Sequence, residues 1–370
     1  MLVPARPNSI NSPEVDHALH MQPYAGQPAW SLQFDELPKW IVRVFDDRGL
    51  VGLGESARGS NPDNLVSVAK NLVGLDAASL TPSTLPIPRC KEHDAFEGAL
   101  LDLVGKSVGW PLHRLLGGAV RDHVEVSAWS GHRTLDDAVT IARAARDDGF
   151  SCIKFKCDLG DDVAGWCAGI RTACGEGMSV ILDPNGRFKE LRHATRIAFE
   201  LDQVGNVTCL EDPLPRWNLE DHAALRRHTK LPIAVHVALE YAEDTQRTQD
   251  LLRAIRLESA DIFNLSAGLL EFQRLATLAE IAARPCWHGS QVDLGILEAG
   301  FVHTAAAALA CTIPSDIFGR RIREHDLLVE PLAISNGQVT VPTGPGLGVM
   351  LDEDALRHYG RREIVVDAST

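Results

Sequence analysis

Lysines and carboxylates follow three strand-like segments in the middle of this chain. The segments read CIKFK at 152–156, ILDPN at 181–185 and CLEDP at 209–213. Each cluster ends an apolar run, and successive clusters lie about 25 to 30 residues apart, the length of one strand, one helix and their loops. Residues at the carboxyl ends of barrel strands meet in one place, so we expect these side chains to gather there. Such a group predicts a base beside a metal site.

Lys154 and Lys156 stand two residues apart on a predicted strand, so their side chains leave the same face. A lysine that is buried beside a second positive charge has a lowered pKa, and it then accepts a proton near neutral pH. We predict that Lys156, nearer the carboxyl end of the strand, is the base and that Lys154 is its electrostatic partner. A pair that only forms salt bridges is the alternative.

Asp183 and Glu211 each end an apolar strand-like segment. A buried carboxylate is costly unless it is paired with a cation or binds a metal. Oxygen ligands from separate strands suit Mg²⁺, which keeps coordination positions open for a substrate carboxylate. We therefore predict a Mg²⁺ site at Asp183 and Glu211, with membership of a structural ion pair as the alternative for either residue alone.

The elements that position these residues alternate between strand and helix from residue 124 onwards. Helical periods fill the gaps between strands, for example at 135–148 and 269–283. Eight strand–helix units in about 200 residues predict a closed parallel barrel. The predicted barrel strands are 124–130, 152–157, 179–185, 207–213, 232–237, 261–266, 285–290 and 314–319.

The part before the barrel reads as a separate α+β unit. Residues 38–56 alternate as two strands around the turn Asp46–Gly49, which is typical of a hairpin. Apolar residues then recur at helical spacing from 92 to 116, and Gly117 and Gly118 close that helix. After residue 330, two short strand-like pieces form a tail.

Composition narrows the class of partner. The chain has 370 residues and a net charge of −14, which argues against nucleic acid because phosphates demand a basic face. It has no run of 18 apolar residues, and its first residues lack the apolar core of a signal peptide. Its eight cysteines form no C-x-x-C pair. We expect a cytoplasmic protein that binds neither membranes nor nucleic acid.

The ordered motifs resemble the enolase superfamily, specifically its mandelate racemase and muconate lactonizing enzyme group. K-x-K, D-x-N and E-D-P occur in that order, A-x-E-x-A-x-x-D-x-x-G-K matches residues 95–106, and L-L-G-G matches 115–118. The resemblance implies a modified (β/α)₇β TIM barrel at 123–330 with an N-terminal α+β capping domain at 1–122. The tail, 331–370, is expected to return to the capping domain.

The resemblance also implies a chemistry. Mg²⁺ binds a substrate carboxylate, a base removes the α-proton, and the metal stabilises the enolate. By position Lys156 matches the family base, and Asp183 and Glu211 match the first two metal ligands. Asn185 and Asp212 match residues beside the metal.

The third metal ligand departs from the family pattern. An acidic residue usually closes the fifth strand, whereas this chain reads PIAVHVALE at 232–240. His236 falls where muconate lactonizing enzymes carry aspartate, and Val237 where the racemases carry glutamate. Imidazole ligates Mg²⁺ but prefers softer metals. We predict His236 as the third ligand, with Glu240 or a weak site as alternatives.

Two further departures concern the acid–base groups. Ser266 stands where cycloisomerases and dipeptide epimerases carry a second catalytic lysine, so the opposing base of a two-lysine racemase is missing. His288 lies near the strand-seven histidine of racemases and sugar-acid dehydratases, but one residue out of register, which would reverse its facing. We predict His288 as a catalytic acid, with Asp316 as its candidate partner. A structural His288 is the alternative, and the protonated Lys156 is then the candidate acid.

We therefore expect a Mg²⁺-dependent lyase or isomerase that removes the proton α to a carboxylate, most readily to dehydrate a hydroxy or sugar acid. A muconate-type cycloisomerase or a racemase is the first alternative. A degenerate member that binds a carboxylate without catalysis is the second. The resemblance further implies a homo-oligomer, and it assigns the capping loop over the small-molecule carboxylate substrate to His17–Trp30.

Overall fold

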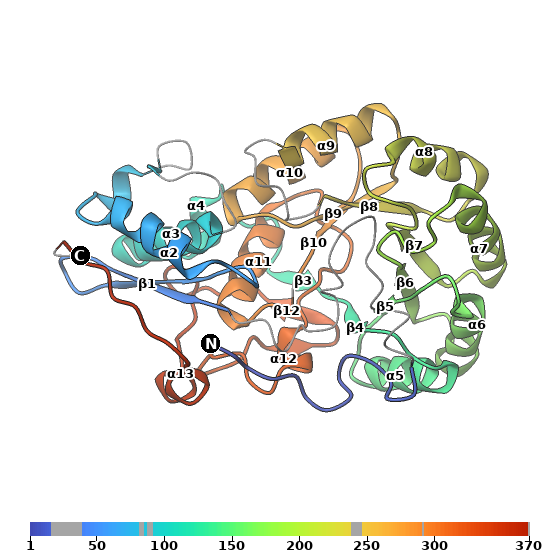
Figure 1. Cartoon of the computed structure of the whole chain (residues 1–370), viewed down its shortest axis with the longest axis horizontal. Coiled ribbons are helices and arrows are strands. Elements are labelled where there is room, and N and C mark those ends of the chain that lie inside the picture. Colours follow the sequence, from blue (N-terminus) through green and yellow to red (C-terminus); the bar gives the residue numbers. More distant parts are fainter. Residues whose placement is uncertain (16–38, 81–84, 87–91, 238–245, 291, 369–370) are drawn as a thin grey trace.

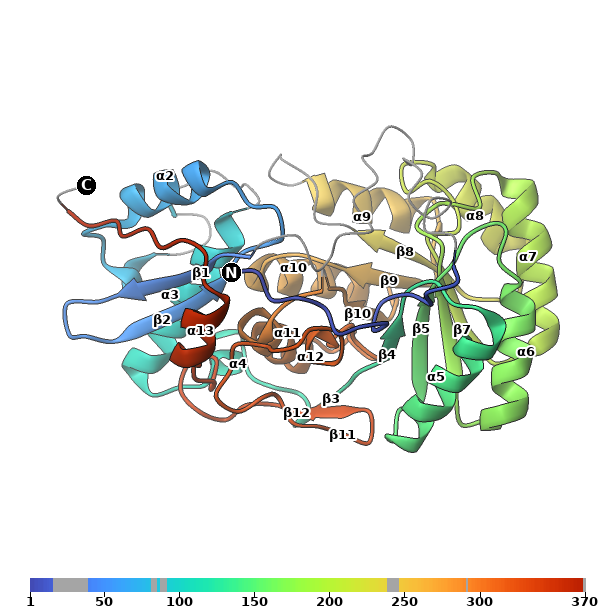
Figure 2. The ribbon, with the colours of Figure 1, turned by 60° about the horizontal axis from the view of Figure 1, so that its bottom comes forward.

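The computed structural model has a barrel and a smaller unit joined to its side (Figures 1 and 2). Together they confirm the predicted modified TIM barrel with an N-terminal α+β unit. The domain boundaries given above stay predictions. The structure describes residues 1–15, 39–80, 85–86, 92–237, 246–290 and 292–368. His17–Trp30 and Glu240 lie outside these ranges.

A seven-stranded parallel sheet forms the barrel, in the order β10-β9-β8-β7-β6-β5-β4. Each strand pairs with the next one along the chain, and a helix crosses over between every two neighbours, the arrangement that parallel pairing requires. The strands are β4 (Ala128–Ser130), β5 (Cys152–Lys156), β6 (Ser179–Asp183), β7 (Val207–Glu211), β8 (Ile233–Val237), β9 (Ile262–Leu265) and β10 (Cys286–His288).

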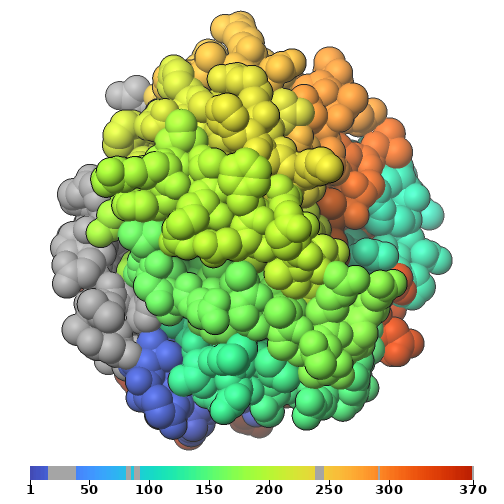
Figure 3. All heavy atoms as spheres, turned by 90° about the vertical axis from the view of Figure 1, so that its right-hand side faces the viewer, coloured from blue at the N-terminus to red at the C-terminus, as the bar shows by residue number. Residues whose placement is uncertain are grey.

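Helices cover the outside of this sheet, and Figure 3 shows those between β4 and β9 as a continuous wall in chain order. Side-chain oxygens of Thr134, Asp162 and Asn218 cap three of them at the N-terminus. None of the helices in the described ranges is long and apolar enough to cross a membrane. The covering helices are α5 (Leu135–Asp147), α6 (Val163–Cys174), α7 (Leu191–Val204), α8 (Leu219–His228), α9 (Gln246–Arg256), α10 (Leu269–Ile281) and α11 (Gly295–Ala307).

The two-residue period of the strands separates the core from the site. One residue of each strand from β5 to β10 joins a small apolar cluster inside the barrel, made of Cys152, Ile181, Cys209, Ala234, Ile262 and Trp287. The alternate residues, such as Ile153 and Phe155, join the large core beneath the helices. Two residues beyond the small cluster, on the same inner face, stand Lys154, Asp183, Glu211, His236, Asn264 and Gly289.

The predicted eighth strand forms only isolated bridges. Ser315 pairs with Val126, Cys311 pairs with Cys286, and the amide of Asp316 donates to the carbonyl of His288 at 2.9 Å. Pro314 has no N–H to give to a ladder, so no regular strand forms there. The segment 311–316 nevertheless lies between β10 and the start of the barrel and places Asp316 at the site.

The smaller unit packs a hairpin on helices. β1 (Ile41–Phe45) and β2 (Val51–Glu55) pair as predicted and lie on α3 (His93–Val108). Contact is close because β2 has glycine at 52 and 54: a Cβ atom at Gly54 would meet the carbonyl oxygen of Ala95 at 1.9 Å. The unit also contains α2 (Pro62–Leu72), the short 3₁₀-helix η1 (Ala77–Ser79) and α4 (Leu112–Leu115).

The tail contacts both parts of the molecule. β11 (Ile334–Ser335) and β12 (Gln338–Thr340) form a sheet with β3 (His123–Glu125), just before the barrel. The short helix α12 (Gly319–Ile322) precedes this tail, and α13 (Glu353–Tyr359) follows β12. The carbonyl of Tyr359, the last residue of α13, accepts a hydrogen bond from the Leu2 amide. Arg43 of β1 pairs with Glu363 at 3.0 Å, so the end of the tail reaches the hairpin.

A buried lysine joins the hairpin to the barrel. The ammonium of Lys39 pairs with Glu55 at 2.9 Å and with Asp293, and all three side chains are almost fully buried. Glu55 also accepts hydrogen bonds from the amides of Leu294 and Leu297 at the start of α11. These contacts fix the hairpin against the loop that follows β10.

Two histidines meet between α4 and α11. Nε2–H of His303 donates to the carbonyl of Leu347 at 3.1 Å, so Nδ1 of His303 accepts the hydrogen bond from Nδ1–H of His113, also at 3.1 Å. Burial lowers the pKa of His303 to about 4, and the bond to Leu347 only partly opposes this. His303 is therefore neutral in the folded protein at neutral pH.

This neutrality predicts a pH-dependent stability. The unfolded chain protonates His303 below its ordinary pKa of about 6.5, whereas the folded chain resists until about pH 4, so stability falls as pH drops through this window. His303→Gln keeps a donor for Leu347 but does not titrate. Between pH 7.5 and 5.0 we expect wild type to lose about 2 kcal/mol more unfolding free energy than the variant, by urea denaturation. Equal losses would contradict this interpretation.

Candidate active site

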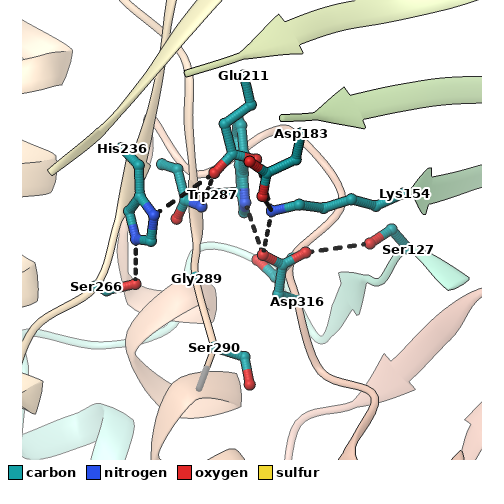
Figure 4. A network of polar contacts seen from close by, with 12 residues as sticks. Ser127, Lys154, Asp183, Glu211, His236, Ser266, Trp287, Gly289, Ser290 and Asp316 are labelled. Carbon is teal, nitrogen blue, oxygen red and sulfur yellow. Dashed lines mark hydrogen bonds and ion pairs between the residues drawn. The ribbon is translucent and has the colours of Figure 1, made fainter. Parts of the chain in front are cut away.

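The carboxyl ends of the barrel strands bring most of the predicted site residues together (Figure 4). β5 supplies the two lysines, β6 and β7 supply carboxylates, and β8 supplies an imidazole. The segment 311–316, between α11 and α12, supplies a further carboxylate. The residues that meet here are Lys154, Lys156, Asp183, Asn185, Glu211, Asp212, His236, Ser266 and Asp316.

Lys154 lies at the centre of this group and is 2% exposed. Its Nζ is 2.6 Å from Glu211 Oε2, 3.0 Å from Asp316 Oδ2 and 3.2 Å from Asp183 Oδ2. Burial acts to lower the pKa of Lys154, but the charges of Asp316, Glu211 and Asp183 outweigh it and raise the pKa well above its usual value. Lys154 is therefore a permanent cation, which fits the electrostatic role predicted for it.

Lys156 differs from Lys154 in exposure and in partners. It ends β5, its side chain is 18% exposed, and its ammonium pairs with Asp183 alone among the residues the structure describes. The geometry thus leaves Lys156 as the lysine with access to the mouth of the barrel. Its role as a base stays a prediction.

Asp183 and Glu211 are both fully buried, but their pKa values are shifted in opposite directions. Burial acts to raise the pKa of Asp183, yet the Lys156 and Lys154 charges outweigh it and hold that pKa well below the usual range. Burial and the neighbouring Asp183 charge raise the pKa of Glu211. Glu211 Oε1 accepts a 2.6 Å hydrogen bond from Asn264, while the buried Oε2 has no well-aligned hydrogen bond, only the close ammonium of Lys154.

An arginine that no sequence motif indicated lies at the edge of this site. Arg216, in the loop between β7 and α8, pairs through Nε with Asp212 and donates from Nη2 to Asn185 Oδ1 at 2.8 Å. Nη2 also lies 3.2 Å from Nδ1 of His236. The only signal in the sequence is its position four residues after the acidic Asp212, because a loop residue belongs to no strand or helix period.

Arg216 fixes the tautomer of His236. Guanidinium groups only donate, so Nδ1 of His236 accepts from Arg216, and Nε2–H donates to Ser266 Oγ at 2.8 Å. Burial, followed by the Arg216 and Lys154 charges, holds the pKa of His236 well below its usual value. Both ring nitrogens of a neutral imidazole are thus engaged.

The donor set fits a divalent cation in part. Asp183 and Glu211 offer the carboxylates that Mg²⁺ prefers, and the buried Oε2 of Glu211 has no well-aligned donor. Glu211, Asp212 and His236 each offer one ligand atom within 4.8 Å of the others. However, Nδ1 of His236 can ligate a metal only after Arg216 releases it. Val237, the other position considered, is buried in the large core.

Asp316 pairs with Lys154, and its carboxylate makes no contact with His288. Its carboxylate receives Lys154, the indole N–H of Trp287 at 3.3 Å and the hydroxyl of Ser127 at 3.4 Å. The predicted pairing of Asp316 with His288 as an acid–base dyad is therefore wrong, and the only bond between them is from the Asp316 amide to the His288 carbonyl.

The structure does not bring His288 to the site. Its ring is fully buried between Phe272 of α10 and Phe301 of α11, with ring centroids 4.3 and 3.7 Å apart, and its Nδ1–H donates to the carbonyl of Gly289. Strand alternation is the reason: Trp287 faces inward, so His288 faces the helices. The expectation of a catalytic His288 is corrected.

Comparison with known proteins agrees with this geometry. The family model "Enolase C-terminal domain-like" matches residues 137–355. Muconate cycloisomerase 1 of Rhodococcus opacus is 29% identical over 88% of this chain and 91% of its own. The o-succinylbenzoate synthase of Bacillus subtilis is 29% identical over 86% and 88%. N-succinylamino acid racemase of Thermus thermophilus is 31% identical over 69% and 67%.

Solved structures show the same likeness. Muconate cycloisomerase from Pseudomonas fluorescens superimposes with a TM-score of 0.76 at 25% identity, over 88% of this chain and 96% of that one. An enolase from Mycobacterium smegmatis, crystallised with formate and acetate, gives a TM-score of 0.75 at 27% identity over 87% and 84%. With its K-x-K, D-x-N and E-D-P residues gathered at one end of the barrel, the chain belongs to the enolase superfamily, in its mandelate racemase and muconate lactonizing enzyme group, and is an enzyme.

Proposed function

We propose that this enzyme moves a proton at the carbon α to a substrate carboxylate, with Lys156 as the single acid–base group, in a reaction of the cycloisomerase type. One observation carries the proposal. Three carboxylates hold Lys154 as a buried cation, while Lys156 is paired with Asp183 alone and is partly exposed. Of the two lysines, Lys156 is therefore the one that can exchange a proton with a bound molecule.

The reaction needs one acid. In a cycloisomerisation, a carboxylate oxygen of an unsaturated acid adds to its own carbon–carbon double bond, and the displaced electron pair forms an enolate with a second carboxylate. The ammonium of Lys156 then gives its proton to the α-carbon and recovers one from water. Because the developing enolate is anionic, Asp183 and Glu211 would repel it, and the fixed charge of Lys154 offsets part of that repulsion.

Ser266, directly after β9, favours a reaction with one acid–base group over a reaction with two. A racemase that works with two bases needs the second on the opposite side of the substrate, and Ser266 offers a hydroxyl that already accepts from His236. Dehydration of a sugar acid, the favoured reading of the sequence, took His288 or the protonated Lys156 as the acid for the departing hydroxide. With His288 between two phenylalanine rings, Lys156 would have to serve that reaction as both base and acid, and the relatives named above are a cycloisomerase, a synthase and a racemase.

We also propose Mg²⁺ as the cofactor, with Asp183 and Glu211 as its protein ligands. A bound Mg²⁺ supplies positive charge to the substrate carboxylate and its enolate. Mg²⁺ keeps several waters and commonly takes only one or two protein carboxylates, so this pair is sufficient. His236 stays the predicted third ligand, conditional on release from Arg216.

Deuterium incorporation tests the role of Lys156. In D₂O with Mg²⁺, we expect cis,cis-muconate, N-succinylamino acids and a panel of hydroxy acids to reveal a substrate whose α-carbon gains deuterium, followed by mass spectrometry. Lys156→Ala should lower this rate by about 10²- to 10⁴-fold, because the group that transfers the proton is gone. The control Lys70→Ala, on the exposed side of α2, should match wild type.

Incorporation that survives Lys156→Ala would contradict the assigned base. No incorporation from any compound, together with no Mg²⁺ binding, would favour the non-catalytic carboxylate-binding alternative. Loss of water from a hydroxy acid would restore dehydration.

Calorimetry tests the metal ligands without turnover. We expect one Mg²⁺ per chain, and a loss of at least about tenfold in affinity for Asp183→Asn and Glu211→Gln, because each removes a charged oxygen ligand. His236→Ala should cost less, since its Nδ1 already accepts from Arg216. Glu176→Gln, at an exposed surface ion pair, is the matched control. Unchanged binding in both carboxylate variants would place the metal elsewhere.

A further inference from the structure

Arg216 is an arginine that the fold holds on three sides. Nε donates to Asp212, and Nη2 contacts Asn185 at 2.8 Å and His236 at 3.2 Å. These partners stand at the ends of β6, β7 and β8, so the guanidinium lies over three neighbouring strands. Its position is therefore set before any ligand arrives.

One nitrogen of the guanidinium, Nη1, is still available to bind a ligand. A guanidinium has five N–H groups, and the three contacts above occupy Nε–H and the two on Nη2. Among the described residues, nothing accepts from Nη1, and the Arg216 side chain is 28% exposed. The two remaining N–H groups share Nη1 and diverge, so Nη1 can donate a charge-assisted hydrogen bond to a carboxylate oxygen from a fixed position, without forming a bidentate fork.

At this site the carboxylates are buried, whereas two of the cations are partly exposed. The carboxylates of Asp183, Asp212 and Glu211 are at most 1% exposed, whereas the side chains of Lys156 and Arg216 are 18% and 28% exposed. A molecule that enters the barrel mouth thus meets two cations with their counter-charges behind them. Lys156 pairs with Asp183 and Arg216 with Asn185, so the two cations flank the same D-x-N turn.

We propose that Nη1 of Arg216 binds a second acidic group of the substrate, so that the enzyme selects dicarboxylates over monocarboxylates. The inference rests on the proposed function, in which Lys156 serves the carbon beside the reacting carboxylate. Arg216 is then a specificity-determining residue that takes no part in proton transfer.

Unreactive ligands test this selection. Calorimetric titration of the Mg²⁺-loaded protein with succinate, glutarate and adipate, each against its monomethyl ester, measures the value of the second carboxylate. In wild type we expect the best diacid to bind at least about tenfold more tightly than its ester, the gain of one charge-assisted contact. In Arg216→Gln, we expect the diacid to lose about this factor and the ester to change less than about twofold.

Two controls accompany the titrations. Arg192→Gln removes an exposed arginine of α7 that pairs with Glu190, and it should keep the wild-type preference. Arg216→Lys keeps the charge without the planar guanidinium that its three partners hold in place, and it should retain only part of the preference. Because Arg216 also pairs with buried Asp212, thermal unfolding of each variant is recorded, and Arg216→Lys carries the test where Arg216→Gln does not fold.

The outcomes divide cleanly. A preference for diacids that is lost with Arg216 supports the inference. Equal weakening of diacid and ester would mean that Arg216 holds the reacting carboxylate, which overturns it. A wild type without preference, including one that binds neither ligand, also overturns it. These ligands do not react, so failure of deuterium incorporation at Lys156 overturns the proposed function alone and leaves the binding result intact.

Discussion

The ion pairs of Lys154 are the interaction on which the rest of the site depends. An ammonium that is 2% exposed is very costly without compensation, and here carboxylates from β6, β7 and the segment after β10 surround it. Asp316 brings the last of these from a segment that forms no regular strand. The lysine thus ties the closing segment of the barrel to the strands that carry the chemistry.

Because Lys154 is held in these ion pairs, the three cations of the site have different roles. A lysine that three anions hold cannot give up its proton, so proton transfer falls to Lys156, and the ordered Arg216 is left to recognise a ligand. The neighbours of each cation, more than its residue type, set its role. The same reasoning explains why His288, stacked between Phe272 and Phe301, has no part in this network.

Strand periodicity explains what could be predicted from the sequence and what could not. Lys154, Asp183 and Glu211 were predictable because each lies two residues after an apolar residue of the inner face, so all three share one phase of the two-residue period. His288 was one residue out of that phase, and the phase proved decisive. Arg216 was not predictable, because its position depends on contacts to Asp212, Asn185 and His236 from three elements that are distant in sequence.

His236 and Arg216 together shift the charge of the site's edge. Where an aspartate would add a negative charge for a metal, this chain has a neutral imidazole, and a guanidinium donates to its free lone pair. Each change weakens the attraction for a cation at that edge and strengthens it for an anion. Glu211 lies 3.6 Å from Nδ1 of His236, and Asp183 pairs with Lys154 and Lys156. The carboxylates that would hold a metal therefore adjoin a cationic edge that attracts an anionic substrate group. This uneven distribution of charge would orient an acid with two charged ends. It comes from His236 and Arg216 and not from the barrel fold that the chain shares with its relatives.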